Sequence, residues 1–148
     1  MKKYYGTRFN SQWDASTWTI IAMVAACCIV NCLFEEWMGP LIICVIMLCF
    51  VITCFIGVFY RIDGNNLVVY LLFIPRAYPI DKMKEVKPTK LWTSAPATSV
   101  THRIAIVFSD RNILKSTTPL IISPVRQQEF INALLSVNPD IMVEGFEQ

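Results

Sequence analysis

Six cysteines and one histidine are the residues of this 148-residue chain best suited to redox, metal or nucleophilic chemistry. All the cysteines lie in two apolar runs, at positions Cys27, Cys28, Cys32, Cys44, Cys49 and Cys54. Because thiolates favour copper(I) and zinc, an intramembrane redox pair or a soft-metal site is one interpretation. We favour another, in which thiols in hydrocarbon stay protonated and serve as small apolar side chains between helices. The sequence therefore predicts no metal and no cofactor.

The single histidine, His102, lies just before a run that alternates like a strand. The polar part of the chain has no cysteine and no second histidine, so it supplies neither a zinc site nor a Cys–His pair. Ser99, His102 and Asp110 could be drawn as a triad, but no nucleophile-elbow or glycine-rich oxyanion motif accompanies them. We predict a surface histidine at the entry of a strand and a protein that is not an enzyme.

A row of basic residues is the best candidate for a binding surface. Its lysines are spaced by two or three positions, with an arginine before them and a tryptophan after: Arg76, Lys82, Lys84, Lys87, Lys90 and Trp92. Next to a bilayer, each lysine could attract anionic headgroups by about 1 kcal/mol. Alternatively, the row is the solvated face of a strand, because Asp81 and Glu85 are interspersed with it.

The elements that would carry these residues follow from an uneven composition. The chain is 55% hydrophobic and 16% charged, whereas soluble domains carry about 25% charge. Between residues 15 and 60 there is no Lys or Arg, and Glu35 and Glu36 are the only acids. Ala15–Phe34 and Leu41–Tyr60 would each form a helix of roughly 30 Å, the thickness of the hydrocarbon core. We predict a hairpin of two transmembrane helices. A net charge of +2 excludes a nucleic-acid surface.

The flanks of the apolar runs predict an orientation in the bilayer. Basic residues precede the first run, and Arg61 follows the second, whereas the turn that contains Trp37 has none. The positive-inside rule then places both termini in the cytoplasm of a bacterial inner membrane. A lipoprotein cleavage before Cys27 is the less favoured alternative, because Asp14 precedes the run and apolar residues follow it.

Within the predicted hairpin, an antiparallel arrangement centred near Met38 puts Cys32 at the depth of Cys44. Asn31 is the one amide of the first run, and we expect it to hydrogen-bond to the partner helix or to another copy of the chain. Self-association, or contact with another membrane protein, would then run through the helices.

Three segments are expected: a cytoplasmic segment over 1–14, the hairpin over 15–60 with helices at 15–34 and 41–60, and a small cytoplasmic α+β domain over 61–148. Tyr60–Ile62 and Leu67–Ile74 are predicted to pair, because Asp63-Gly64-Asn65-Asn66 supplies the positive φ angles of a tight turn. Pro75 and Pro79 are expected to end the second strand. Further strands are predicted over 80–86, 103–109 and 120–123.

A C-terminal amphipathic helix is predicted to close the sheet. Ser123 is the expected N-cap, Pro124 the first helical residue, and Asn138-Pro139 the stop. The apolar stripe between them consists of Phe130, Ile131, Leu134 and Leu135. This order of elements fits a pleckstrin-homology-like (PH-like) antiparallel sheet or partial barrel with one helix at its end.

The polar half also resembles the bacterial YyaB-like PH-domain family. The resemblance rests on a serine, proline and alanine run, an Arg-led strand, an Ile-Ser-Pro helix start and an Asn-Pro ending, found here at 94–99, 103–108, 121–124 and 138–141. The sequence departs from the family at Thr98, where leucine is usual, and at 73–79, where the family has a tight glycine turn. The resemblance implies a PH-like fold beside a membrane but no established activity.

Two functions remain open at this point. The chain is either a non-catalytic, membrane-tethered binding or scaffold module, with lipid or protein as its ligand, or an accessory subunit of a membrane transporter or envelope enzyme. In the second case the helices would make the main contact.

Overall fold

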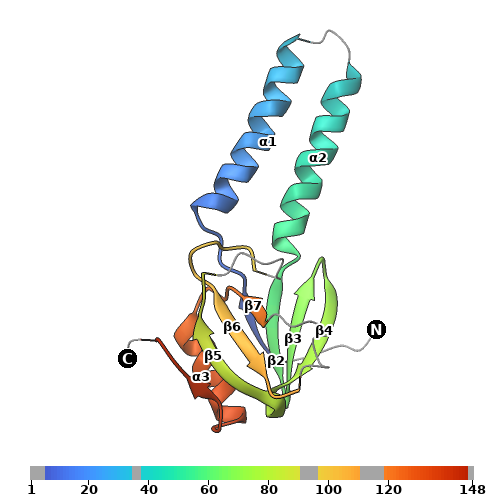
Figure 1. Cartoon of the computed structure of the whole chain (residues 1–148). Coiled ribbons are helices and arrows are strands. Elements are labelled where there is room, and N and C mark those ends of the chain that lie inside the picture. The colour runs from blue at the N-terminus through green and yellow to red at the C-terminus, as the bar shows by residue number, and fades with distance from the viewer. Residues whose placement is uncertain (1–5, 35–37, 91–96, 111–118, 147–148) are drawn as a thin grey trace.

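The computed structural model describes residues 6–34, 38–90, 97–110 and 119–146, without the side chains of 32, 34, 38 and 40. Helices α1 (Ala15–Phe34) and α2 (Met38–Ile56) form an antiparallel hairpin that rises from one end of a domain of two sheets and a third helix (Figure 1). Among the residues described, no helix combines the length and the apolar character needed to cross a membrane.

The helical hairpin is inserted into the turn of a β-hairpin. Strand β1 (Thr7–Asn10) pairs antiparallel with β2 (Phe59–Asp63), so that Asn10 lies directly opposite Phe59. Asn10 and Phe59, which are neighbours in the sheet, therefore flank the whole helical hairpin. The two ends of the hairpin meet the domain side by side (Figure 1). β1 was not predicted, because a strand of only 4 residues is too short to show a periodic pattern.

Helix α2 ends earlier than the sequence predicts. Helix α1 has the expected bounds, but α2 spans Met38–Ile56 and not 41–60. It ends early because Phe59 and Tyr60 continue the apolar run as part of β2, where their backbones pair with β1 and β3. An apolar run alone does not distinguish a helix from a buried strand.

The first sheet has the order β1-β2-β3-β4, with β3 at Asn66–Leu71 and β4 at Ile74–Pro79. The predicted turn between β2 and β3 is confirmed, and Gly64 adopts a φ of +54° there. The prediction of one strand over Leu67–Ile74 is wrong, because β3 ends at Leu71 and β4 begins at Ile74; Pro75 lies within β4, and Pro79 is its last residue. β4 is an edge strand, and proline is tolerated there because no outer neighbour needs its missing N–H.

The second sheet has the order β7-β6-β5-β8 and follows a short 3-10 turn, η1 (Ile80–Lys82). Its strands are β5 (Met83–Pro88), β6 (Ile104–Phe108), β7 (Leu120–Ile122) and β8 (Met142–Val143). β6 and β7 correspond to the predicted strands, whereas the strand predicted over 80–86 begins only at Met83, because Ile80–Lys82 form η1. β8 pairs parallel with β5, so this sheet is mixed and not wholly antiparallel as expected.

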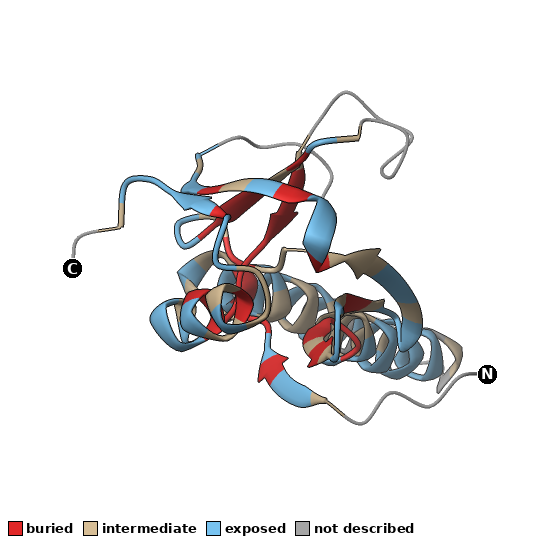
Figure 2. Cartoon of the chain, turned by 90° about the horizontal axis from the view of Figure 1, so that it is seen from below, coloured by how far each residue is buried: buried red, intermediate tan, exposed pale blue. Residues whose placement is uncertain are grey.

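Helix α3 (Gln127–Val137) packs its apolar stripe against the sheets, and Phe130, Ile131 and Leu134 are buried as predicted. Figure 2 shows that other buried positions concentrate on the strands. The predicted stop is confirmed, since Asn138 follows the helix and donates its N–H to the carbonyl of Leu134. The predicted N-cap is wrong. Arg126 occupies that position, and Ser123 is fully buried in a polar network described below.

Candidate functional site

The junction between the helical hairpin and the sheets is held by Asp14, the residue before α1. Its Oδ1 accepts hydrogen bonds from the Ser16 hydroxyl and, at 3.3 Å, from the N–H of Thr17. This is the geometry of an N-cap, in which a carboxylate satisfies a free amide in the first turn. Asp14 therefore fixes where α1 begins.

The second carboxylate oxygen of Asp14 holds a distant segment. Oδ2 accepts from the Ser99 hydroxyl at 2.9 Å, and from the N–H groups of Val100 at 2.6 Å and Thr101 at 3.3 Å. Partial burial acts to raise the pKa of this carboxyl, but the hydrogen bonds from Ser16, Val100, Ser99 and Thr101 together outweigh burial and hold it well below its ordinary value. One ionised side chain thus fastens the loop before β6 to the base of α1.

A buried hydroxyl network lies beneath this contact. The Ser11 hydroxyl is 3.0 Å from both Tyr60 Oη and Ser123 Oγ, and 2.7 Å from Thr98 Oγ1. The N–H of Ser123 donates to Tyr60 Oη at 3.0 Å. Burial raises the pKa of the Tyr60 phenol, despite opposing hydrogen bonds from Ser11 and Ser123, so the group stays neutral. Four separate stretches of chain therefore meet at one satisfied polar core.

Two pockets flank the junction. The larger, of about 620 Å³, lies between the bases of α1 and α2 and the segment over 97–103. Most of its walls are apolar, while Ser16, Thr19 and Thr98 contribute hydroxyls and Arg103 a largely buried cation. The guanidinium Nε of Arg103 donates to the carbonyl of Ser99. The smaller pocket, of about 390 Å³, includes Arg8 and the ring of Trp13. Each of the two pockets has a mainly apolar lining and one arginine, which are the features that a site for an amphipathic anion would require.

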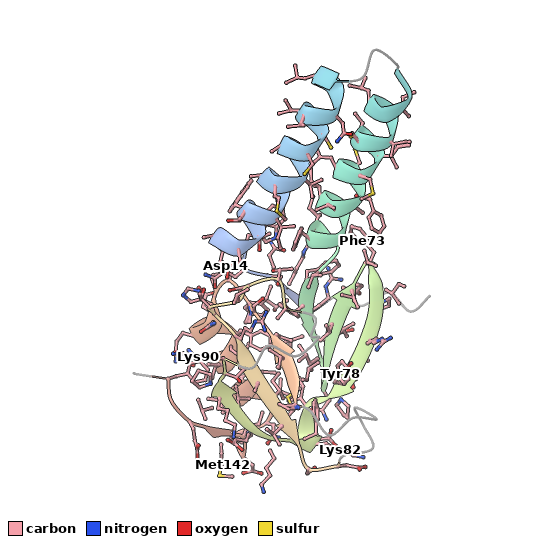
Figure 3. All side chains as sticks on the ribbon, turned by 45° about the horizontal axis from the view of Figure 1, so that its top comes forward. Asp14, Phe73, Tyr78, Lys82, Lys90 and Met142 are labelled. Carbon is pink, nitrogen blue, oxygen red and sulfur yellow. The ribbon has the colours of Figure 1, made fainter. Side chains whose placement is uncertain are left out.

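The predicted basic row does not form one patch. Lys82, Lys84, Lys87 and Lys90 are all exposed along η1, β5 and the residues that follow, but Arg76 lies on β4 of the other sheet. Figure 3 shows Lys82 at the end of the domain far from the helices and Lys90 nearer to them. Trp92 lies outside the described residues.

One lysine of this row is already paired. Lys87 Nζ lies 2.7 Å from Glu85 Oε1, and this hydrogen bond together with the charge of Glu85 raises the pKa of Lys87. The row therefore leads away from the hairpin along a strand, and its charge is partly compensated.

The residues considered for catalysis make other contacts. The hydroxyl of Ser99 is buried and donates to Asp14, while His102 is exposed, with Nδ1 2.8 Å from the Thr101 hydroxyl. These contacts are not those of a nucleophile and its base. No group of three or more His, Cys, Asp or Glu suited to a metal occurs in the described parts of the chain.

Between the helices, the contact to Cys44 comes from Cys28, whose Sγ lies 3.5 Å from the Cys44 carbonyl oxygen. The side chain of Cys32, predicted at this depth, lies outside the described residues. The Asn31 amide donates to the Cys27 carbonyl of its own helix at 2.7 Å, and not to the partner helix as one of the two expectations held. Asn31 also lines a pocket of about 290 Å³ between α1 and α2.

The sequence contains a local signal for the helix-capping role of Asp14. An aspartate before Ala-Ser-Thr and an apolar run is a typical N-cap pattern. Its second set of partners, over 99–101, has no such local signal, because these residues are more than eighty positions away in the sequence.

The family model described as "Bacterial PH domain" matches residues 58–138, from the end of the helical hairpin through the end of α3. No curated protein and no solved structure matches the chain.

Proposed function

Because the chain belongs to the bacterial PH domain family, we propose that it is a non-catalytic binding module, tethered to the cytoplasmic face of a bacterial inner membrane by α1 and α2. The observation that carries this proposal is the surface of the two helices. Large apolar side chains are exposed along both, including Ile29, Leu33, Ile43, Ile46 and Phe50.

An exposed apolar surface of this kind is unfavourable in water. Contiguous exposed apolar surface of this extent is rare on soluble monomers and marks a membrane or protein contact. The described helical segments carry no Asp, Glu, Lys or Arg. Helix α1 is 20 residues long and α2 is 19 residues long, so each has a length of about 30 Å, close to the hydrocarbon thickness of a bilayer.

The insertion of the hairpin between β1 and β2 supports the proposed orientation. The two ends of the hairpin enter one sheet, so a single membrane face must hold both. Arg8 and Arg61 are paired across these strands, close to the helix ends, where the positive-inside rule favours the cytoplasm. The junction pockets would then open near the headgroups, where an acidic amphipathic ligand could reach Arg103.

Membrane fractionation tests the tether. We expect the full chain to stay in the membrane pellet after alkaline carbonate extraction, because carbonate strips proteins that are held only by charge. The matched control is a hairpin-excised chain, in which a short Gly-Ser linker joins Asp14 to Val58; we expect it in the supernatant. Release of the full chain by carbonate would contradict the tether.

A second candidate is an accessory subunit that contacts a larger membrane protein through the helices. The exposed amide of Asn31 favours it, because a polar group facing lipid is unfavourable and usually lies against another protein. If it holds, a stoichiometric partner will co-purify with the full chain in mild detergent and will be lost when Asn31→Leu is purified from the same membranes. Recovery of the partner with Asn31→Leu would remove this candidate.

A further inference from the structure

The turn between β3 and β4 exposes four consecutive large apolar side chains. Leu71, Leu72, Phe73 and Ile74 are 42%, 43%, 48% and 63% exposed. Nothing within the described domain covers them, although its other strands bury most of their large apolar residues. This turn is therefore a compact apolar projection, since the other exposed large apolar residues of the described domain are Val125, Met142 and Val143.

The backbone of this turn suits other residues better. Leu72 and Phe73 adopt φ angles of 51° and 65°, and they are the only described residues other than glycine with positive φ. Two successive residues with positive φ form a hairpin turn whose central positions are normally occupied by Asn-Gly. Leu and Phe are disfavoured at these positions, because their Cβ atoms make close contacts with the backbone when φ is positive. Local stability would select small residues at these positions. The bulky apolar pair is thus not explained by the fold.

The turn is held beside the base of α2. The N–H of Phe73 donates to the carbonyl of Gly57 at 3.2 Å, and the rings of Phe73 and Phe59 lie 6.3 Å apart. A Cβ on Gly57 would come within 2.9 Å of Leu72 Cα, so only glycine allows this approach. Figure 3 shows Phe73 at the end of the domain from which the helices rise, close to the level of Asp14.

We propose that Leu71–Ile74 inserts into the interfacial layer of the phospholipid bilayer that holds the helices. This inference rests on the proposed membrane tether. The occupant is lipid because the apolar surface of the turn continues that of α2, where Ile56 is exposed next to Gly57. Arg76 is exposed two residues beyond the turn, within reach of headgroup phosphates. With the two helices, the turn gives a third point of attachment, which fixes the tilt of the domain and the depth of the junction pockets.

Site-specific fluorescence in the full chain tests the inference. In a background with all six cysteines replaced by alanine or serine, a single Phe73→Cys carries an environment-sensitive label. The protein is placed in vesicles of three parts phosphatidylcholine to one part phosphatidylglycerol. We expect quenching by lipids that carry a spin label near the headgroup, and little quenching by aqueous iodide.

Two control positions separate this inference from the tether. A label on Asn65→Cys, in the opposite turn of the domain, should be quenched by iodide only, while a label on Met47→Cys, midway along α2, should be quenched by lipids spin-labelled deep in the chains. If Met47 is not quenched by lipid, the tether itself is wrong. If Met47 is quenched but Phe73 behaves like Asn65, only the insertion of the turn is wrong.

A second variant addresses the conformation of the turn without relying on Phe73→Cys. In detergent, away from the bilayer, Leu72→Asn/Phe73→Gly should raise the thermal midpoint of the domain, because these residues fit positive φ. In the vesicles, with the label moved to Ile74→Cys, the same double variant should reduce lipid quenching several-fold while quenching at Met47 is unchanged. A lower midpoint, or unchanged quenching at Ile74, would overturn the proposal.

Discussion

A chain that begins at Val58, where the family match starts, will not form a stable domain, whereas the hairpin-excised chain will. The truncated chain lacks β1, so the outer edge of β2 loses its hydrogen-bonded neighbour and the ring of Phe130 loses its contact with Phe9. Phe9 is buried, and its ring meets that of Phe130 edge-on at a centroid distance of 5.2 Å. The truncation also removes Ser11, leaving the Tyr60 and Ser123 hydroxyls short of a buried partner.

Amide dispersion in NMR spectra and cooperative thermal unfolding would distinguish the two chains. In the hairpin-excised chain, Phe9→Ala should cost about 3–5 kcal/mol of unfolding free energy, because it leaves a cavity against Phe130. Thr7→Ala, on the exposed face of the same strand, should change it by about 0.5 kcal/mol or less. A well-folded chain starting at Val58 would show that β1 is dispensable.

Asp14→Ala is expected to lower the free energy of unfolding by about 3 kcal/mol. It removes a helix cap, worth about 1 kcal/mol, and the charged hydrogen bonds that hold 99–101, worth about 1.5–3 kcal/mol. Faster proteolysis at Arg103 should accompany the loss, because the preceding loop is released. Asp140→Ala, an exposed change beyond α3, serves as the control, and equal effects of both changes would contradict the role of Asp14.

The same contacts predict a pH dependence. The pKa of Asp14 is lower in the folded chain than in the unfolded chain, so below about pH 4 the unfolded chain takes up a proton that the folded chain does not. The contribution of Asp14 to stability is therefore full above its unfolded pKa and declines as the pH falls toward the folded pKa. Asp14→Asn should flatten this acid limb of the stability curve, as measured by denaturant unfolding at several pH values.

Local patterns predicted much of the fold. The bounds of α1 follow from an apolar run, the β2–β3 turn from Asp-Gly, and the buried face of α3 from helical spacing. Strand β6 was recognisable from alternation at 104–108. Each of these signals depends on residues a few positions apart, so the sequence carries it without knowledge of the fold. The match to a bacterial PH domain over residues 58–138 confirms the PH-like part of the fold class that these patterns favoured.

The tertiary structure alone decided the candidate site. Thr7–Asn10 forms a strand only because it pairs with β2, which follows the whole helical hairpin in the sequence. Ser123 belongs to the buried hydroxyl network only because the fold brings it to Ser11 and Tyr60. Likewise, Leu72 and Phe73 stand out only once their φ angles and their place beside Gly57 are known. Composition and periodicity determined which segments are apolar and most of those that are helical or extended. Pairing between distant segments, which local propensity does not encode, decided where their side chains meet.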